Sequence, residues 1–463
     1  MARVLLSTIM VAPILLFSAS YSRAQQPPPE PSQIVETATP PPITIAGVPA
    51  PKDVPSKPLT ANEAARIAVV HQPTIESAKQ AVIAAQGRTQ QARAATLPNL
   101  LVGAAYTNVQ SLNTVDHVTS TGVQTVPGWL GTSTLKQLLY DFQHTRETVA
   151  QSNLLIAVAQ DALLKARYDL VLETKQAYYS YANSLRALDI ADSSLANRQK
   201  QLDLANAQLK SGLGLPSDVA RAETSVAQGV TALIAARAAA SLARINLALV
   251  MGIDPRTPLD VTQQDEPTVT ATDITELVVA ALKQRPDIRL ADDTIQSMRH
   301  GVKAAKTTNA PVLSASVGLG TSGLSTPPTN DAFSIGLALS WNPFDGGFTA
   351  GKIKEARANE ATAIAQKKSA EFAVASDVAQ AYVSLRTAEQ RILSATNSVI
   401  DAKEGLRIAV GRFSHGLGLF LDITDAETAL ESAESDLTNA TNDVDQARAA
   451  LTHAIGSPVP TTP

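Results

Sequence analysis

The 463-residue chain contains no cysteine. Disulfides, thiolate metal sites, a cysteine nucleophile and a lipid anchor on cysteine are therefore not expected, and stability should come from packing or assembly. Charged residues are also scarce, at 17% of the chain, with a net charge of −4 and no basic cluster. A nucleic-acid partner is accordingly not expected.

Long hydrophobic runs and catalytic motifs are scarce too. After the first 24 residues no segment offers 18 consecutive apolar residues, so any membrane crossing should use β-strands. The six histidines are scattered without metal-ligand spacing, and the Gly-x-Gly segments lack the third glycine of a dinucleotide fingerprint. We expect no enzyme activity, no metal and no cofactor.

The chain begins with a predicted signal peptide at 1–24. A short basic start precedes the apolar run Val4 to Phe17, and Ser22-Arg23-Ala24 gives a small-x-small cleavage pattern. The alternative, an N-terminal membrane anchor, is disfavoured by the shortness of that run. Residues 25–58 are rich in proline and are predicted to form an extended linker, and 457–463 are predicted to be a C-terminal tail.

An internal repeat organises the rest of the chain. Pro73 matches Pro286 at an offset of 213, whereas Asp218 matches Asp422 at an offset of 204. The repeats are predicted at 59–252 and 273–456, with an equatorial connector at 253–272. Each should consist of a helix, two strands, a long helix, a tight turn and a helix, with a hairpin nine residues longer in the first repeat.

The helices are predicted from a sustained 3,4 spacing in which large and small residues alternate. In the second repeat this seam consists of Val378, Ala381, Leu385, Ala388, Ile392, Ala395, Val399, Ala402, Leu406, Ala409 and Phe413. The first repeat has the same seam with one charged exception, Arg198. Such a period is typical of antiparallel coiled-coil pairs.

Helix lengths predict a tube wall. A helix over 143–211 should span about 100 Å. Shorter helices over 217–250 and 273–308 should stack end to end to match it, so that continuous and broken helices alternate.

The strand pairs are predicted within 97–142 and 311–344, where the period switches to two. Apolar residues alternate with small polar ones over runs of about ten residues, the length that a tilted strand needs to cross a bilayer. Four strands cannot close a barrel, and open edges are not tolerated in lipid. Several chains must share one barrel, and three copies would give twelve strands and a passage.

Together these features resemble the TolC family of outer-membrane factors over Leu59 to Ile455. The stretch Gln284-Arg285-Pro286-Asp287 and the two Gly-Leu-Gly turns carry part of the resemblance. The strand-to-helix corner carries the rest through Trp341, Pro343, Phe344, Asp345, Gly346 and Gly347.

The resemblance implies a fold that is mainly α with transmembrane β: a homotrimer with a 12-stranded outer-membrane β-barrel continued by a 12-helix antiparallel coiled-coil α-barrel in the periplasm. It also implies a passive exit duct of a tripartite efflux or type I secretion system. Its partners would be outer-membrane lipid, a periplasmic membrane-fusion adaptor and an inner-membrane pump of the RND, ABC or MFS type.

A periplasmic gate is also implied by the resemblance. Asp425 matches an acidic ring position, Phe413 matches an aromatic of the gating links, and Ser217 and Asp218 match their partners on the neighbouring turn. Asp422, three residues before Asp425, lies on the same helix face and completes the predicted gate. The turns predicted to contact the adaptor consist of Gly212, Leu213, Gly214, Gly416, Leu417 and Gly418.

One gate position departs from the family. Gly418 stands where some members place a gate arginine. Arg221 is the repeat-mate of Asp425, at the offset of 204. We hypothesise that these two residues form an alternating charge ring, the alternative being two solvated surface charges.

Two other functions remain open from the sequence. A trimeric outer-membrane adhesin also builds a barrel from four strands per chain, but such proteins place one barrel segment at the C-terminus. A periplasmic coiled-coil scaffold would lack the lipid-facing alternation of the strands.

Overall fold

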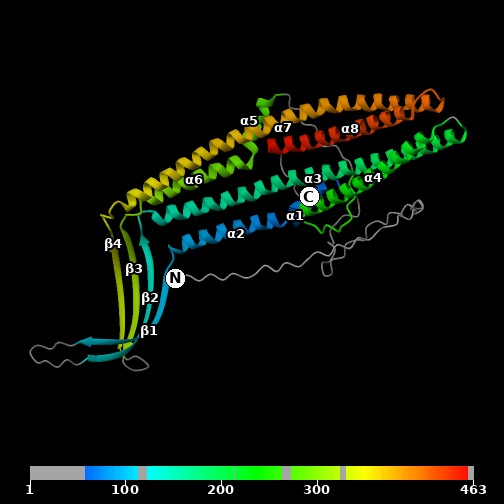
Figure 1. Cartoon of the computed structure of the whole chain (residues 1–463). Helices are drawn as coiled ribbons and strands as arrows, with labels where there is room; N and C mark the ends of the chain where they lie inside the picture. Colours follow the sequence, from blue (N-terminus) through cyan, green and yellow to red (C-terminus); the bar gives the residue numbers. More distant parts are fainter. Residues whose placement is uncertain (1–57, 113–122, 213, 263–272, 324–329, 457–463) are drawn as a thin grey trace, which may run out of the picture. The chain divides into compact units, whose positions relative to one another are not determined.

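The computed structural model describes residues 58–112, 123–212, 214–262, 273–323 and 330–456, and these are mainly helical (Figure 1). The first repeat contains α1 (Ala61–His71), α2 (Pro73–Ala94), β1 (Asn99–Leu112), β2 (Val123–Tyr140), α3 (His144–Lys210) and α4 (Pro216–Met251). The second contains α5 (Ile274–Gln284), α6 (Pro286–Lys306), β3 (Val312–Gly323), β4 (Asn330–Ser340), α7 (Phe348–Ser414) and α8 (Phe420–Ile455). The same order of elements thus occurs twice.

Each repeat opens with a short capped helix. Thr60 and Glu63 form a capping box on α1, and the Asp273 carboxylate accepts a hydrogen bond from the Thr275 backbone N–H at 2.9 Å on α5. Pro73 and Pro286 then occupy the first positions of α2 and α6. The single helix predicted over 273–308 is therefore wrong, because proline restricts the preceding residue to extended backbone and breaks the helix at Arg285.

The four strands form one antiparallel sheet in the order β1-β2-β3-β4. The first strand pair is longer than predicted, since β1 runs to Leu112 and β2 begins at Val123. The longer hairpin predicted for the first repeat is thus formed partly by longer strands. A register shift between Leu138 and Tyr140 ends the regular pairing of β2 with β3.

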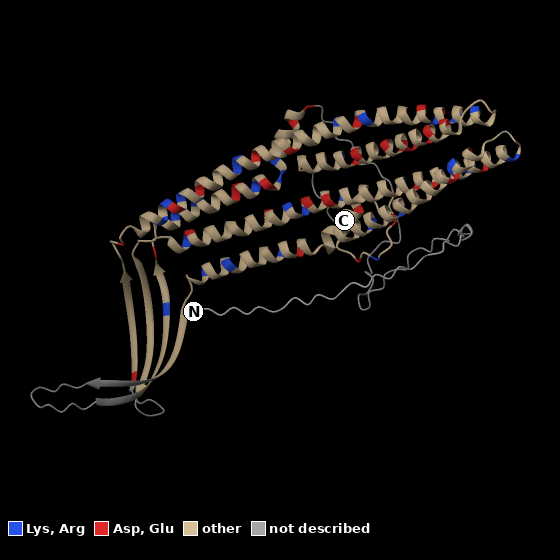
Figure 2. Cartoon of the chain, viewed as in Figure 1, with Lys and Arg blue, Asp and Glu red and all other residues tan. Residues whose placement is uncertain are grey.

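The register gives the sheet two chemically different faces, because residues directly opposite on paired strands share a face. One face is mainly apolar and carries Leu100, Val102, Ala104, Tyr106, Leu135, Leu313, Ala315, Val317, Leu319, Phe333, Ile335, Leu337 and Leu339. Ser133, Gln137, Thr321 and Asp331 are polar residues on the same face. The other is dominated by small and hydroxyl residues and includes Gly103, Thr132, Thr134, Lys136, Ser314, Ser316, Gly318, Ser334 and Gly336. Figure 2 shows how few charges the described strands carry.

The long helices α3 and α7 each hold 67 residues, so each spans about 100 Å. The predicted seam of α7 is confirmed: eight of its eleven residues are buried, from Val378 to Phe413. Helix α3 packs against α2, α4, α6 and α8, whereas α7 packs against α5, α6 and α8. The continuous helix α3 therefore has neighbours on several sides.

The short helices stack within their own repeat. Gly252, just after α4, lies against the junction of α1 and α2, where a Cβ on this glycine would be 2.9 Å from Gln72 Cα. The Gln72 side-chain amide donates to the Val250 carbonyl at 3.0 Å. Gly456, just after α8, lies in the same way against Arg285 at the junction of α5 and α6.

The predicted stacking of 217–250 on 273–308 is therefore wrong. Helix α4 meets α2, and α8 meets α6. Helices α2 and α6 hold 22 and 21 residues, so either would add nearly the same length to α4, and length alone could not distinguish them.

Helix α4 is the one helix among the described residues that is long and apolar enough to cross a membrane by length and composition. Its alanine-rich sequence explains this, since small residues are what a close helix contact requires. It packs along α3 as one arm of a helical hairpin.

Candidate functional site

The candidate site lies at the tips of the two helical hairpins, α3–α4 and α7–α8, at the helix ends opposite to the sheet (Figure 1). A small apolar cluster joins them, made of the buried residues Ala205, Ala222, Ala409, Phe413, Phe420 and Ile423. Phe413 and Phe420 meet edge to face with ring centroids 5.5 Å apart. This cluster closes the end of the α7–α8 hairpin onto the α3–α4 hairpin.

A polar contact reinforces the join. The Gln208 side chain of α3 donates a hydrogen bond to the Phe413 carbonyl of α7 at 2.8 Å. The predicted gate aromatic Phe413 is only 4% exposed. In this structure it therefore packs between the hairpins of its own chain.

The charged residues predicted for the gate lie on the outside of the same tips. Arg221 of α4 and Asp425 of α8 are exposed, as is Ser217, and Asp218 is half-buried. Within the described part of this single chain no ion pair joins Arg221 to Asp425. Asp422 has a local role, because its carboxylate accepts a hydrogen bond from the Leu419 backbone N–H at 3.3 Å and caps α8.

The turns are built on glycines with left-handed backbone. Gly212 has φ 77° and its repeat-mate Gly416 has φ 72°. Gly214 is required for a different reason, since a Cβ there would lie 2.8 Å from the Leu209 backbone nitrogen, and Gly418 is similarly tight against Arg412. Leu213, predicted as a contact residue, lies outside the described residues.

Large apolar side chains stand out from these turns. Leu417 is 72% exposed, and Leu215 and Leu419 are exposed as well. Exposed leucines clustered at one end of a molecule are typical of a surface that a partner covers.

The strand-to-helix corners lie at the other end of the long helices. Asp345 caps α7 by accepting hydrogen bonds from the Gly347 and Thr349 backbone N–H groups at 3.0 and 2.8 Å. Hydrogen bonds from Thr349 hold the pKa of Asp345 below its usual range. Gly346 and Gly347 have φ 62° and 91°.

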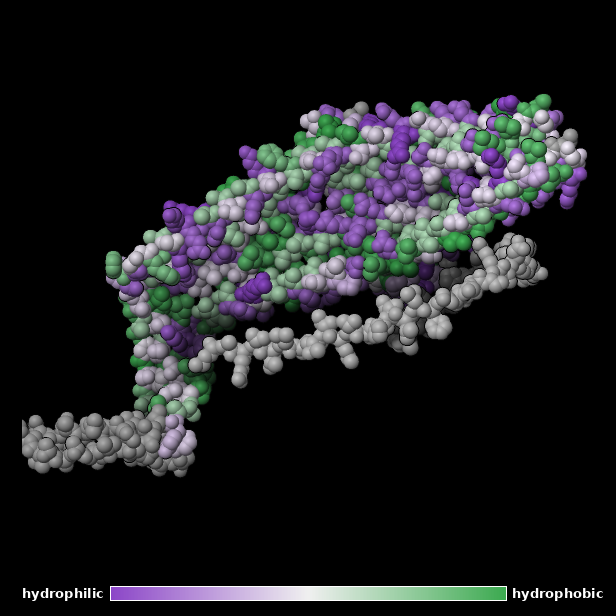
Figure 3. Space-filling view, viewed as in Figure 1, coloured by the Kyte–Doolittle hydropathy of each residue, from purple (hydrophilic) through white to green (hydrophobic). Residues whose placement is uncertain are grey.

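The aromatic residues of this corner are exposed. Phe344 is 85% exposed, and Trp341 and Phe348 are also largely uncovered. Pro343 is exposed between them. Figure 3 shows apolar side chains uncovered along the strands that lead to the corner.

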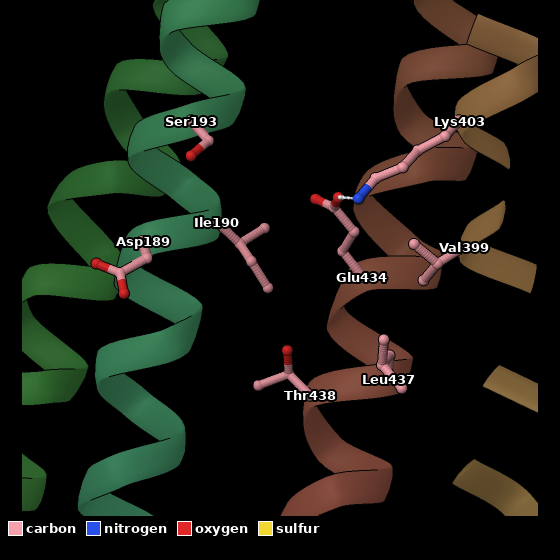
Figure 4. A pocket seen from close by; sticks show the side chains of 8 residues that line it. All are labelled: Asp189, Ile190, Ser193, Val399, Lys403, Glu434, Leu437 and Thr438. Carbon is pink, nitrogen blue, oxygen red and sulfur yellow. Dashed lines mark ion pairs between the residues drawn. The ribbon is translucent and has the colours of Figure 1, made fainter. Parts of the chain in front are cut away.

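A groove separates the two hairpins on the side of the tips that faces the sheet (Figure 4). It has a volume of about 310 Å³ and is lined by Asp189, Ile190, Ser193, Val399, Lys403, Glu434, Leu437 and Thr438. Ile190 of α3 and the α8 side chains face each other across it, and Lys403 pairs with Glu434 at 3.1 Å. The hairpins are thus in direct contact at the tip and less tightly packed further towards the sheet.

Sequence reasoning missed a polar cluster between the groove and the tip. Arg198, only 8% exposed, pairs with Glu431 at 2.6 Å and donates to Ser225. Glu427 lies buried beside this pair. The available signal was Arg198 itself, the only charged residue in an otherwise apolar seam, but nothing in the spacing indicated its partners.

Comparison with known proteins places the chain in a family. Residues 65–253 and 277–457 match the model of the outer membrane efflux protein family, one match in each repeat. The fusaric acid resistance protein FusA of Burkholderia cepacia is 27% identical over 206 residues, 41% of this chain and 37% of that protein. The outer membrane efflux protein BepC of Brucella suis biovar 1 is 25% identical over 228 residues, 48% of this chain and 49% of that protein.

The fold is also found in a solved structure. The outer membrane protein VceC of Vibrio cholerae is 24% identical, with a TM-score of 0.72 over 86% of this chain and 96% of that chain. The two sequence relatives are matched over half of their length or less, so the two family-model matches are the firmer sequence result. On these matches the chain belongs to the outer membrane efflux protein family, which confirms the resemblance seen in its sequence.

Proposed function

We propose that this chain is one subunit of a homotrimeric exit duct in the outer membrane, the channel component of a tripartite efflux or type I secretion system. The sheet supports this proposal most directly. Its apolar face is bare over the described strands, with Ile335 and Leu337 each more than 70% exposed. Such a face suits lipid, and the opposite face of serine, threonine and glycine suits a water-filled interior.

The edges of the chain support assembly from several copies. Strands β1 and β4 each pair on one side only within the chain. The helices form a layer in the same order. Helices α2 and α4 pack against α3 at one edge of this layer, and α7 forms the other edge. Open strand edges are costly in lipid, so β4 of one copy would pair with β1 of the next. Three copies would supply twelve strands, which leave a passage.

The bounding helices carry matching apolar stripes. On α7 the exposed stripe consists of Ile364, Phe372, Val383, Leu393, Ile400 and Ile408. On α4 it consists of Val230, Ile234, Leu242, Ile245 and Leu249. These stripes would cover each other in a ring of copies, extending the barrel into a tube of twelve long and stacked helices.

Cross-linking tests the assembly. Because the chain has no cysteine of its own, only the introduced cysteines can react. Val102→Cys on β1 would be combined in turn with cysteine at Phe333, Ile335, Leu337 or Leu339 on β4, and treated with a short thiol cross-linker. At least one combination should give covalent dimers and trimers.

A matched control uses strands that pair within one chain. Leu135→Cys with Val317→Cys joins directly opposite residues of β2 and β3, so it should cross-link only within the chain. If the control reacts while all four edge combinations stay monomeric, the shared barrel is contradicted.

We further propose that the turns at 211–215 and 415–419 dock a periplasmic membrane-fusion adaptor, which connects the duct to an inner-membrane pump of the RND, ABC or MFS type. The exposed Leu215, Leu417 and Leu419 support this. Purification of the native complex from membranes should recover an adaptor and a pump. Recovery of the channel alone under conditions that preserve other envelope complexes would count against docking.

No specific observation favours the two other functions. The family matches extend over both repeats, with helices on either side of each strand pair, and this arrangement differs from an adhesin with one C-terminal barrel segment. In a periplasmic scaffold the exposed apolar face of the sheet would have no apolar surroundings to contact.

A further inference from the structure

Arg198 is a charged residue at the centre of the contact between the two hairpins. Its guanidinium donates to Ser194 Oγ on its own helix α3 at 3.2 Å, and to Ser225 Oγ on α4 at 3.0 Å. The other terminal nitrogen donates to Glu431 on α8 at 2.6 Å. One side chain thus connects α3 and α4 of the first hairpin to α8 of the second.

The surrounding sequence makes room for this side chain. A Cβ on Gly229 of α4 would lie 3.0 Å from Arg198 Cδ, so a larger residue there would push the arginine aside. The repeat-mate of Arg198, at the offset of 204, is Ala402, so the second repeat has no equivalent.

A second carboxyl group competes for the same arginine. Glu427 lies one turn before Glu431 on α8, so both point to the same helix face. It is 4% exposed, and apart from the nearby Gln201 side chain no described residue offers its carboxyl oxygens a hydrogen bond. A buried carboxylate without partners is strongly unfavourable, whereas the neutral acid is tolerated.

The neighbours of Glu427 set its protonation. Burial raises the pKa of Glu427 to about 7, the like charge of Glu431 adds to this rise, and Arg198 and Gln201 of α3 oppose it. Helix α4 presents the neutral Ser225 and Gly229, and Lys403 of α7 is engaged by Glu434 further along α8. Glu427 is therefore protonated in acidic solution and ionises near neutral pH while the hairpins stay packed.

We propose that Arg198, Glu431 and Glu427 form a proton-sensitive latch between the two hairpins, which holds them together while Glu427 is protonated. Once Glu427 is ionised, its charge is unfavourable in the buried position, and solvating it requires the two hairpins to move apart. The proposal rests on the exit-duct function and adds to it a control of the tip by pH.

The direction of the pH effect follows from the two pKa values. An exposed glutamate has a pKa of 4.5, below that of Glu427 in the packed arrangement. The packed arrangement therefore binds the proton more tightly than a separated one. Its extra stability is full below pH 4.5, declines as the pH rises, and is lost once the pH passes about 7.

Spin-label distances on the full-length protein test the latch. Lys210→Cys and Ser414→Cys mark the last residues of α3 and α7, and labelled chains are diluted among unlabelled ones. The distance between labels should be short at about pH 5 and longer at about pH 8. In Glu427→Gln, which cannot ionise, it should stay short over the whole range.

The repeat provides a matched control. Glu223 is the repeat-mate of Glu427 at the offset of 204 and is exposed on α4, so Glu223→Gln should follow the unmodified protein. Unchanged helical circular dichroism shows that the variants fold. An equal pH response in Glu427→Gln and Glu223→Gln, or no response in the unmodified protein, would overturn the latch.

Conductance separates this proposal from the exit duct. If neither the unmodified protein nor any variant conducts in planar bilayers at any pH, the duct itself fails, and the label distances still decide whether the latch exists. If all conduct but the label distance in Glu427→Gln follows the same pH curve as in the unmodified protein, only the latch fails.

Discussion

At the residue scale, the two strand-to-helix corners have the same kind of helix cap, built from different residues. Asp141 and Asp345 cap α3 and α7 in the same way, each accepting a hydrogen bond from the backbone N–H four residues on. The two positions that follow have left-handed backbone in both repeats. The second repeat has glycines there, but the first has Phe142 and Gln143, at φ 53° and 73°. The first corner is therefore the more strained one.

The Asp141 cap should carry measurable stability. Asp141→Ala removes the acceptor for the Thr145 backbone N–H and hydroxyl, so the loss should be about 1 kcal/mol. Thermal unfolding followed by circular dichroism should show a lower midpoint. Asp189→Ala, an exposed aspartate within the same helix, should leave the midpoint unchanged or raise it slightly, and an equal loss in both variants would contradict the capping role.

At the element scale, glycine decides where the helices turn. Gly416 has φ 72°, and a Cβ there would meet no atom within 4 Å. Glycine at this position is therefore needed only for its left-handed backbone, and not to avoid a steric clash. Gly411, within α7, has equally open surroundings but helical backbone.

These two glycines predict opposite effects of the same substitution. Gly416→Ala should destabilise the hairpin by about 1–2 kcal/mol because alanine is strained in left-handed backbone. Gly411→Ala should stabilise α7 by about 0.5–1 kcal/mol because glycine is a poor helix former. Denaturant midpoints of both variants provide the measurement, and the same sign in both would refute the turn assignment.

At the scale of the whole molecule, the exposed charges of the tips become relevant only when copies are assembled. Arg221 and Asp425 do not meet in one chain, so the proposed alternating charge ring requires neighbouring copies. Each exposed pair would contribute ~0.2–1 kcal/mol to closure, and several pairs act together in a ring.

Conductance in planar bilayers measures this contribution. Arg221→Ala and Asp425→Ala channels should both conduct more than the unmodified protein at low salt. The difference should shrink at about 1 M salt, where exposed charges are screened. Glu223→Gln, an exposed charge on the same helix as Arg221, serves as the control. Unchanged conductance in both alanine variants would show that these side chains are merely solvated.

Much of this architecture could be predicted from local patterns. The alternation of Leu313, Ala315 and Val317 with small polar residues marks a two-faced strand whatever surrounds it. The seam from Val378 to Phe413 predicts a buried helix face because its period matches that of packed helices. The recurrence of Asp218 at Asp422 reveals the duplication. The strand and seam patterns depend only on neighbours along the chain, and the duplication is seen by comparing the two halves of the sequence.

Contacts between distant segments were decided by the tertiary structure alone. The sequence by itself established a duplicated chain of long helices and two-faced strands. It could not show that α4 ends on α2, because Gly252 and Gln72 are brought together only when the repeat folds back on itself. Nor could it show that Glu427 lies buried beside Arg198 and Glu431, since a carboxyl group's protonation depends on which side chains from other helices exclude water from it.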